Sequence, residues 1–237
     1  MPRRGVFVRG RSHCQCTVAL ECRVTTSWNN GHVYIPPKHA VDNDEAWQIV
    51  RDAGAGLLII STPEGLASVF VPVVVSEDRR TLTSHLAKAN SWWNSVSGDT
   101  EVLAIFLVAS AYVSPTYYPS RLENPGVVPT WNYVVAEVRG RLTLHEELEW
   151  MQNQVRAVTG QFESGRNPEW RVDDLDPQYR DQQLKAIVGM EIEVTSIEGK
   201  AKMSQNRPEV DQKSVRDHLA ERTLGEQNVA NRMKPIS

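Results

Sequence analysis

The segment TSHLAKAN, residues 83–90, places hydroxyl, imidazole and ammonium groups within six positions. Thr83, Ser84 and His85 are consecutive, and Lys88 follows about one helical turn later. Hydrogen-bond donors and a cation that arrive together form the kind of set that binds a phosphate monoester. Serine is also a preferred residue at the start of a helix, so a plain N-cap explains Ser84 equally well.

A second polar stretch is IEGKAKMSQNRPEV, residues 197–210, where no acid separates five basic or amide side chains: Lys200, Lys202, Gln205, Asn206 and Arg207. The alternation in VGMEIEVTS just upstream predicts a half-buried strand. Pro208 suits the first turn of a helix, because a missing N–H costs nothing there. A strand that passes through a basic turn into a helix start is suited to binding an anion. The alternative is a solvated loop with scattered charges.

The third group is the connection 111–134, which holds four tyrosines, four prolines and Trp131. Long ordered loops tend to be functional. Flat aromatic side chains beside Asn132 could hold a planar heterocycle, although a loop that only covers one end of a barrel would look the same. Together the three groups indicate one anionic ligand that carries a ring.

Several function classes are excluded by what the sequence lacks. It has no P-loop, no G-x-S-x-G, no H-E-x-x-H and no Rossmann glycine fingerprint. A net charge of −3 argues against gripping nucleic acid over the whole surface. No run of about 18 apolar residues is present, so we expect no membrane span. The start MPRRG has no long apolar segment after it, which argues against a secretory signal.

All three cysteines, Cys14, Cys16 and Cys22, fall in the first 22 residues. A disulfide framework is therefore not expected to hold the fold together, and a cytoplasmic location is predicted. The motif HCQC at 13–16 has no second cluster to complete a metal site, so we predict no metal.

The elements that must position these groups follow from periodicity. Asp42 with Glu45 predicts a helix start and Gly54 its end. Strands are expected at 57–62, 66–75, 81–85, 101–109, 130–145 and 190–197. Amphipathic helices are expected at 148–162, at 176–188 with Gly189 closing it, and near the C-terminus. Antiparallel strands that come first, with helices later, predict an α+β domain built on a small barrel.

From Val33 onward the chain resembles the PaiB-like FMN-binding negative transcriptional regulators, which belong to the wider pyridoxamine-phosphate-oxidase-like split-barrel group. The resemblance covers about residues 33–220 and rests on a series of segments in order: YIPPKHAVD, HLAKAN, AYVSPTYYPS, PTWNYV, WRVDDL, AIVGMEIEV and IEGKAKMSQNR. It implies a six-stranded antiparallel split barrel with flanking helices, homodimeric, with FMN between the subunits.

The resemblance also implies roles for single residues. Thr83, Ser84, His85 and Lys88 would face the FMN phosphate, with Lys88 standing where arginine is commoner. The strand that contains Ser68, Val69 and Phe70 would follow the edge of the flavin ring. Asn132 would approach from the partner subunit. The remaining residues that the resemblance assigns to the cofactor site are Asn90, Trp131, Lys202, Gln205 and Arg207, the last three on its open side.

Two functions are carried forward. One is a regulatory flavoprotein that senses or regulates through the flavin pocket; the other is an FMN-dependent oxidoreductase acting on a small anionic substrate. Haem or another flat cofactor is a weaker third possibility. Without a recognition helix, direct DNA binding is predicted to be weak.

Three segments are expected along the chain. Residues 1–32 are predicted to be a poorly packed extension upstream of a start at Val33, residues 33–222 the FMN-binding domain, and residues 223–237 a polar tail.

Overall fold

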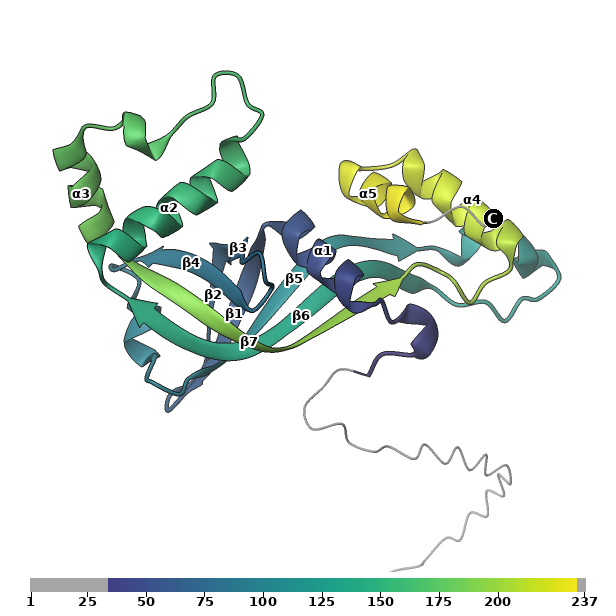
Figure 1. The fold of residues 1–237 in the computed structure, drawn as a ribbon. Helices are drawn as coiled ribbons and strands as arrows, with labels where there is room; N and C mark the ends of the chain where they lie inside the picture. Colours follow the sequence, from purple (N-terminus) through teal and green to yellow (C-terminus); the bar gives the residue numbers. More distant parts are fainter. Residues whose placement is uncertain (1–33, 234–237) are drawn as a thin grey trace, which may run out of the picture. The chain divides into compact units, whose positions relative to one another are not determined.

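The computed structural model describes residues 34–233, so the expectations for residues 1–32 and for a start at Val33 lie outside the described residues. Its strands form one antiparallel sheet in the order β2-β1-β5-β6-β7-β4-β3 (Figure 1). The strands are β1 (Ala55–Thr62), β2 (Gly65–Pro72), β3 (Val74–Val75), β4 (Thr81–Ala87), β5 (Glu101–Val113), β6 (Thr130–His145) and β7 (Ile187–Lys202).

The sheet closes on itself. β2 and β3 are its two edges, yet only Val73 separates them along the chain. The edges must therefore meet, and Ser84 on β4 donates from Oγ to the carbonyl of Pro72 at 2.6 Å across this junction. The expected α+β class is confirmed, but this sheet has seven strands rather than six. The extra strand is β3: the expected strand 66–75 is interrupted at Val73, directly after Pro72, which has no N–H to donate to the ladder.

Five α-helices and five short 3₁₀ helices are present in residues 34–233, and none of them is long and apolar enough to cross a membrane. The α-helices are α1 (Asn43–Ala53), α2 (Leu148–Glu163), α3 (Pro177–Lys185), α4 (Glu209–Ala220) and α5 (Leu224–Arg232). The 3₁₀ helices are η1 (Pro37–His39), η2 (Ser91–Ser95), η3 (Pro115–Tyr117), η4 (Pro119–Leu122) and η5 (Val172–Asp174).

Helix α1 begins and ends where the sequence predicts. The Asp42 carboxylate accepts the backbone N–H of Glu45 at 2.8 Å, and Gly54 takes the left-handed conformation with φ of 65°. Its apolar residues Trp47, Ile49 and Val50 are buried in the main core. A capped amphipathic helix of this kind covers one face of the sheet.

The strands alternate between a buried inner face and an outer face. On β6 the inward side chains Val134, Ala136 and Val138 are buried, whereas Val135 and Glu137 between them are partly exposed. Helices α1 and α5 pack on the side of these buried residues. On the outer face of β1, β2 and β5, the side chains of Leu57, Phe70 and Leu107 are exposed.

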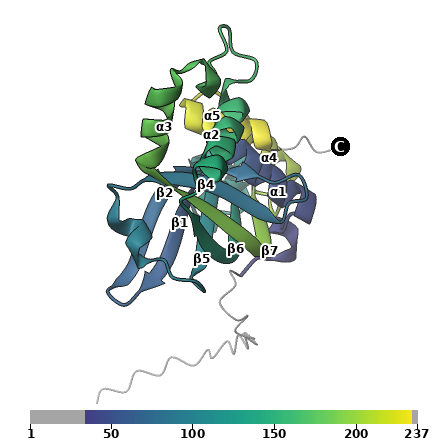
Figure 2. The same cartoon turned by 60° about the vertical axis from the view of Figure 1, so that its left-hand side comes forward.

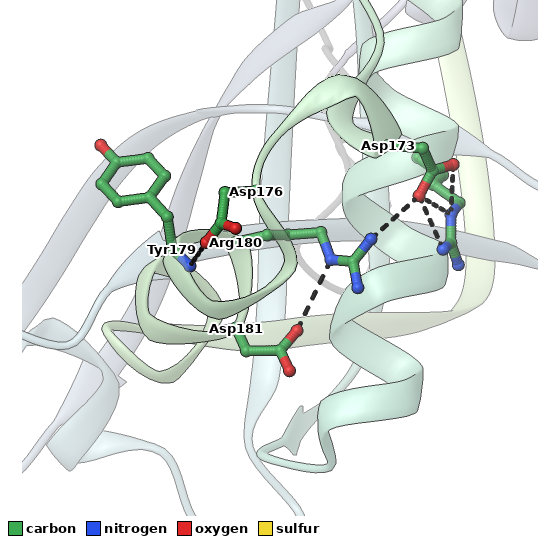
Figure 3. A network of polar contacts seen from close by, with 6 residues as sticks. Asp173, Asp176, Tyr179, Arg180 and Asp181 are labelled. Carbon is green, nitrogen blue, oxygen red and sulfur yellow. Dashed lines mark hydrogen bonds and ion pairs between the residues drawn. The ribbon is translucent and has the colours of Figure 1, made fainter.

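Helices α2 and α3 lie at the β4 side of the sheet (Figure 2). Figure 3 shows the ion pairs that join them: Asp173 in η5 receives Arg180 from α3 at 3.4 Å. Asp173 also receives the guanidinium of Arg156 from α2, with Nη2 at 2.8 Å. This carboxylate therefore fixes α3 and η5 against α2.

Several expected boundaries are wrong: the strand expected at 101–109, for example, continues to Val113 as β5. The helix predicted to reach Val188 ends at Lys185, and β7 already begins at Ile187 because Ile187–Gly189 pair with β4. Strand β7 continues to Lys202, since pairing with β6 extends the ladder beyond residue 197. Residues 224–232 form α5 rather than a polar tail, because Val229 and Ala230 are buried against the core.

Candidate functional site

Strand β4 places the residues that were predicted to bind the phosphate on two different faces of the sheet. Ser84 is buried with Leu82 and Leu86 on the inner face. Thr83 and His85 point to the opposite face, because side chains alternate along a strand. The Ser84 hydroxyl already donates to the Pro72 carbonyl, so its structural role is to join the two edges of the barrel.

His85 lies beneath helix α2. Its Nδ1 is 2.6 Å from Oε1 of Gln154, a side chain that is only 4% exposed. Because the amide oxygen is an acceptor, Nδ1 of the neutral ring carries the proton. Burial lowers the pKa of His85 below its ordinary value, and the hydrogen bond that His85 donates to Gln154 opposes this shift in part. The ring is therefore neutral at pH 7.

Acidification should destabilise the protein through His85. The unfolded chain binds a proton near pH 6.5, whereas the folded state does so only at lower pH. Stability should therefore fall as the pH drops below about 6.5, by at most about 1.4 kcal/mol per pH unit for this one group. His85→Gln should remove that part of the slope in urea unfolding between pH 7.5 and 5. His39→Gln is measured in parallel. Because burial also lowers the pKa of His39, this variant should reduce the slope as well. A slope unchanged by His85→Gln would contradict the assignment.

Lys88 follows β4 in a turn that three hydrogen bonds define. Its backbone N–H donates to the carbonyl of Ala186 at 2.8 Å, and its own carbonyl accepts the indole N–H of Trp93 at 3.0 Å. Asn90 caps η2 by accepting the N–H of Trp92 at 3.0 Å, so the cap considered for Ser84 belongs to Asn90. The Lys88 side chain is one-third exposed, and its ammonium group pairs with the Glu146 carboxylate at 2.7 Å.

Asn132 lies on the inner face and is completely buried. Its Oδ1 accepts the Ser204 hydroxyl at 3.1 Å, and its amide lies 3.9 Å from Sδ of Met233. Its neighbour Trp131 points outward, is half exposed, and meets Tyr112 edge to face with ring centroids 6.3 Å apart. The exposed aromatic platform is therefore this pair rather than the tyrosines of the loop.

Two loop tyrosines are used by the fold. Tyr118 is completely buried, with the Arg207 guanidinium 4.4 Å from the centre of its ring. Tyr117 stacks on His218 of α4 at 4.5 Å. These contacts attach the connection 114–129 to the helices at the C-terminal end, so neither ring lies free to hold a heterocycle.

The basic stretch is split between a strand and a turn. Lys200 and Lys202 lie on β7, where Lys202 bonds to the hydroxyl of Thr130, and only residues 203–207 form the turn. Gln205 in that turn contacts Nδ1 of His39 through its Oε1 at 3.0 Å. The same side chain lines a cavity of about 430 Å³ between β7 and α4.

The candidate residues form two groups at opposite ends of β7. His85 pairs with Gly189, and Tyr133 pairs with Lys202. Lys202 is thirteen positions after Gly189, which is about 40 Å at the usual rise of 3.3 Å per residue. One chain therefore does not bring Thr83, His85 and Lys88 to the same ligand as Lys202.

The part of the outer face formed by β1, β2 and β5 carries exposed apolar side chains. Ser68 and Phe70 point outward from edge strand β2, whereas Val69 packs against the core. Phe70 is 70% exposed and lies opposite Leu57 of β1, and Leu107 of β5 is 57% exposed. Exposed apolar side chains that lie next to one another in this way mark an interaction surface.

Sequence reasoning missed Glu146, Gln154 and Asp211, which contact Lys88, His85 and Ser120. Each stands far from its partner along the chain, so no local pattern identifies the pair. Gln154 does carry one signal: it interrupts the apolar stripe of α2 between Met151 and Val158, and it is buried there.

Comparison with known proteins agrees with this fold. Residues 33–196 match the family model described as "Putative FMN-binding domain". "Protease synthase and sporulation protein PAI 2" from Bacillus subtilis is 30% identical over 190 residues, which is 79% of this chain and 89% of that protein.

Two solved structures share the fold at low identity. The flavocytochrome Anf3 from Azotobacter vinelandii has a TM-score of 0.57 at 11% identity, with 73% of each chain covered. The FAD and heme binding protein from Mycobacterium smegmatis has a TM-score of 0.53 at 12% identity, covering 70% of this chain and 73% of that one. The match to the family model extends over more than half of the sequence, and the cofactor that it assigns is FMN. The chain therefore belongs to the PaiB-like family of FMN-binding domain proteins.

Proposed function

We propose that this protein is a PaiB-like regulatory flavoprotein, a homodimer that holds FMN in a pocket between its subunits. One observation carries the proposal. The candidate cofactor residues lie at the two ends of β7, and the exposed apolar face of β1, β2 and β5 belongs to the same sheet. If a second copy packed on this face, one end of its sheet would lie near the opposite end of the sheet of the first copy.

The side chains present fit FMN in their chemistry. Lys88 offers an ammonium group and Thr83 a hydroxyl for the phosphate, and both are accessible to some degree. Phe70 and Trp131 supply exposed apolar rings for the flat ring system. Bound FMN would supply electron and hydride transfer, and the residues named here would bind and orient it.

The occupant of the outer face is proposed to be a second copy of this chain. The exposed side chains of Phe70, Leu57 and Leu107 lie on three neighbouring strands. A stable interface has an apolar centre of this kind. Such an interface buries more than about 2,000 Å² in an obligate dimer.

The direct test is uptake of FMN by purified protein, followed by its absorption spectrum and by titration calorimetry. Lys88→Ala should weaken FMN binding by about 1.5–3 kcal/mol, because a hydrogen bond to a charged group is lost. Lys213→Ala on α4 is the matched control, since that lysine pairs with Asp217 far along the chain from β4. A folded protein that takes up no FMN would refute the proposal.

A second candidate is an FMN-dependent oxidoreductase that acts on a small anionic substrate. The ammonium groups of Lys38, Lys200 and Lys202 lie close enough to His39 to help burial lower its pKa. A cluster of cations at one end of the sheet suits an anion. Reduction of the bound flavin by NADH or NADPH, accelerated by a small carboxylate or phosphate, would favour this candidate over the regulator.

Regulation is proposed to act through the pocket rather than through direct contact with DNA. Three clustered lysines are fewer than the 6–10 phosphate contacts of a typical duplex-binding protein. Any DNA binding by the isolated protein is expected to be weak and salt-sensitive, with a Kd no tighter than about 10⁻⁶ M. A gel-shift series that shows nanomolar binding to one promoter would contradict this.

A further inference from the structure

Three of the four donors that sequence reasoning assigns to the phosphate are already bonded within the protein. Ser84 donates to Pro72 O at 2.6 Å, His85 contacts Gln154 at 2.6 Å, and Lys88 contacts Glu146 at 2.7 Å. Only the last partner is both charged and accessible: the Glu146 side chain is 61% exposed. Glu146 is therefore the one partner that a ligand from solvent can replace without opening the core.

The position of Glu146 is fixed by the corner between β6 and α2. His145, the last residue of β6, stacks on Trp150 of α2 with ring centroids 4.2 Å apart and planes inclined by 6°. Trp150 in turn lies over Gly189, where any Cβ would come within 2.2 Å of its ring. Because both flanks of Glu146 are held in this way, its carboxylate is presented to Lys88 from a rigid support.

Other carboxylates lie next to Glu146 and to its neighbour His145. Glu147 follows Glu146 directly, and Glu191 on β7 lies 3.8 Å from Nε2 of His145. A phosphate that approaches Lys88 meets a carboxylate already paired with that ammonium. Two anions at one ammonium repel each other, and this repulsion weakens with salt.

We propose that Glu146 is a built-in competitor of the flavin phosphate: it occupies the Lys88 ammonium in the empty site and is exchanged for the phosphate when the cofactor binds. This inference rests on the proposed function, and it names one residue that sets the affinity of the site for FMN. Glu146 lowers the affinity for a phosphorylated flavin and leaves binding of the ring itself unaffected. It therefore keeps FMN exchangeable rather than permanently bound.

The test compares Glu146→Gln with the unmodified protein, using FMN and riboflavin as ligands of the apoprotein. Riboflavin has the same ring system and no phosphate. Glu146→Gln should tighten FMN binding by about three- to tenfold at low salt, as expected for removing one unit charge a few ångströms from a dianion. Riboflavin binding should not change, and the gain in FMN affinity should shrink in 0.5 M NaCl.

Glu149→Gln is the matched control, because it removes the same charge from an exposed position in the first turn of α2. It corrects for the general effect of charge at that helix start and should change FMN affinity by less than twofold. In a Lys88→Ala background the gain from Glu146→Gln should be smaller, since no ion pair remains to be broken.

The outcomes separate this inference from the proposed function. If unmodified protein binds FMN and Lys88→Ala weakens it, but Glu146→Gln binds as before or more weakly, only the role of Glu146 is overturned. An equal gain for riboflavin would also overturn it, because the phosphate would then not be involved. If the folded protein and both variants bind no FMN, the proposed function itself fails.

Discussion

Replacing Leu107 by aspartate should separate the proposed dimer into monomers. Leu107 lies on the outer face of β5, opposite Val135 of β6, and is 57% exposed in the single chain. In the proposed dimer each subunit would bury one new carboxylate among apolar side chains, and an unpaired buried charge costs about 3–5 kcal/mol. The dissociation constant should therefore rise by at least about 100-fold.

The measurement is sedimentation equilibrium or light scattering over a concentration series. Leu224→Asp is the control: Leu224 is 84% exposed and is the first residue of α5, where an acid is tolerated. Leu224→Asp should remain dimeric, and thermal unfolding should show that both variants fold. If unmodified protein is a stable monomer while it holds FMN, the proposed interface is wrong.

The elements with strong local signals could be predicted from the sequence. The Asp42 cap and Gly54 bound α1, and the alternation of β6 gives the correct buried residues. The start of β7 could not be predicted in the same way. Ile187–Gly189 follow a helix and carry no alternation, and only their pairing with β4 makes them strand residues.

The candidate site shows the same limit. The cluster of donors at 83–88 is visible in the sequence, but the alternation of a strand separates Ser84 from Thr83 and His85. The pairs Lys88–Glu146 and His85–Gln154 join residues 58 and 69 positions apart. A single sequence names donors and acceptors, yet the contacts between distant elements decide which of them already have partners.

Asp211 provides the largest expected effect on stability. It lies on α4, is completely inaccessible to solvent, and holds the connection between β5 and β6. One carboxylate oxygen accepts the backbone N–H of Ser120 at 3.0 Å, and the other accepts its hydroxyl at 2.6 Å. Asp211→Ala leaves both donors of the partly buried Ser120 without a partner and opens a small cavity. The free energy of unfolding should fall by about 3–5 kcal/mol.

Asp217→Ala on the same helix separates this effect from a general loss of charge. Asp217 is half exposed and pairs with Lys213 at 2.7 Å, so its removal should cost less than about 1 kcal/mol. Ser120→Ala should be milder than Asp211→Ala, because the backbone N–H still binds the carboxylate. Urea unfolding of the three variants and of the double variant gives the coupling energy between Asp211 and Ser120.

Near-equal losses for Asp211→Ala and Asp217→Ala would show that the buried pair does not anchor the loop. The expected difference would instead show that α4 anchors the connection 114–129, including the buried Tyr118 beside Ser120. The aromatic rings of this connection would then stabilise the fold rather than bind a ligand.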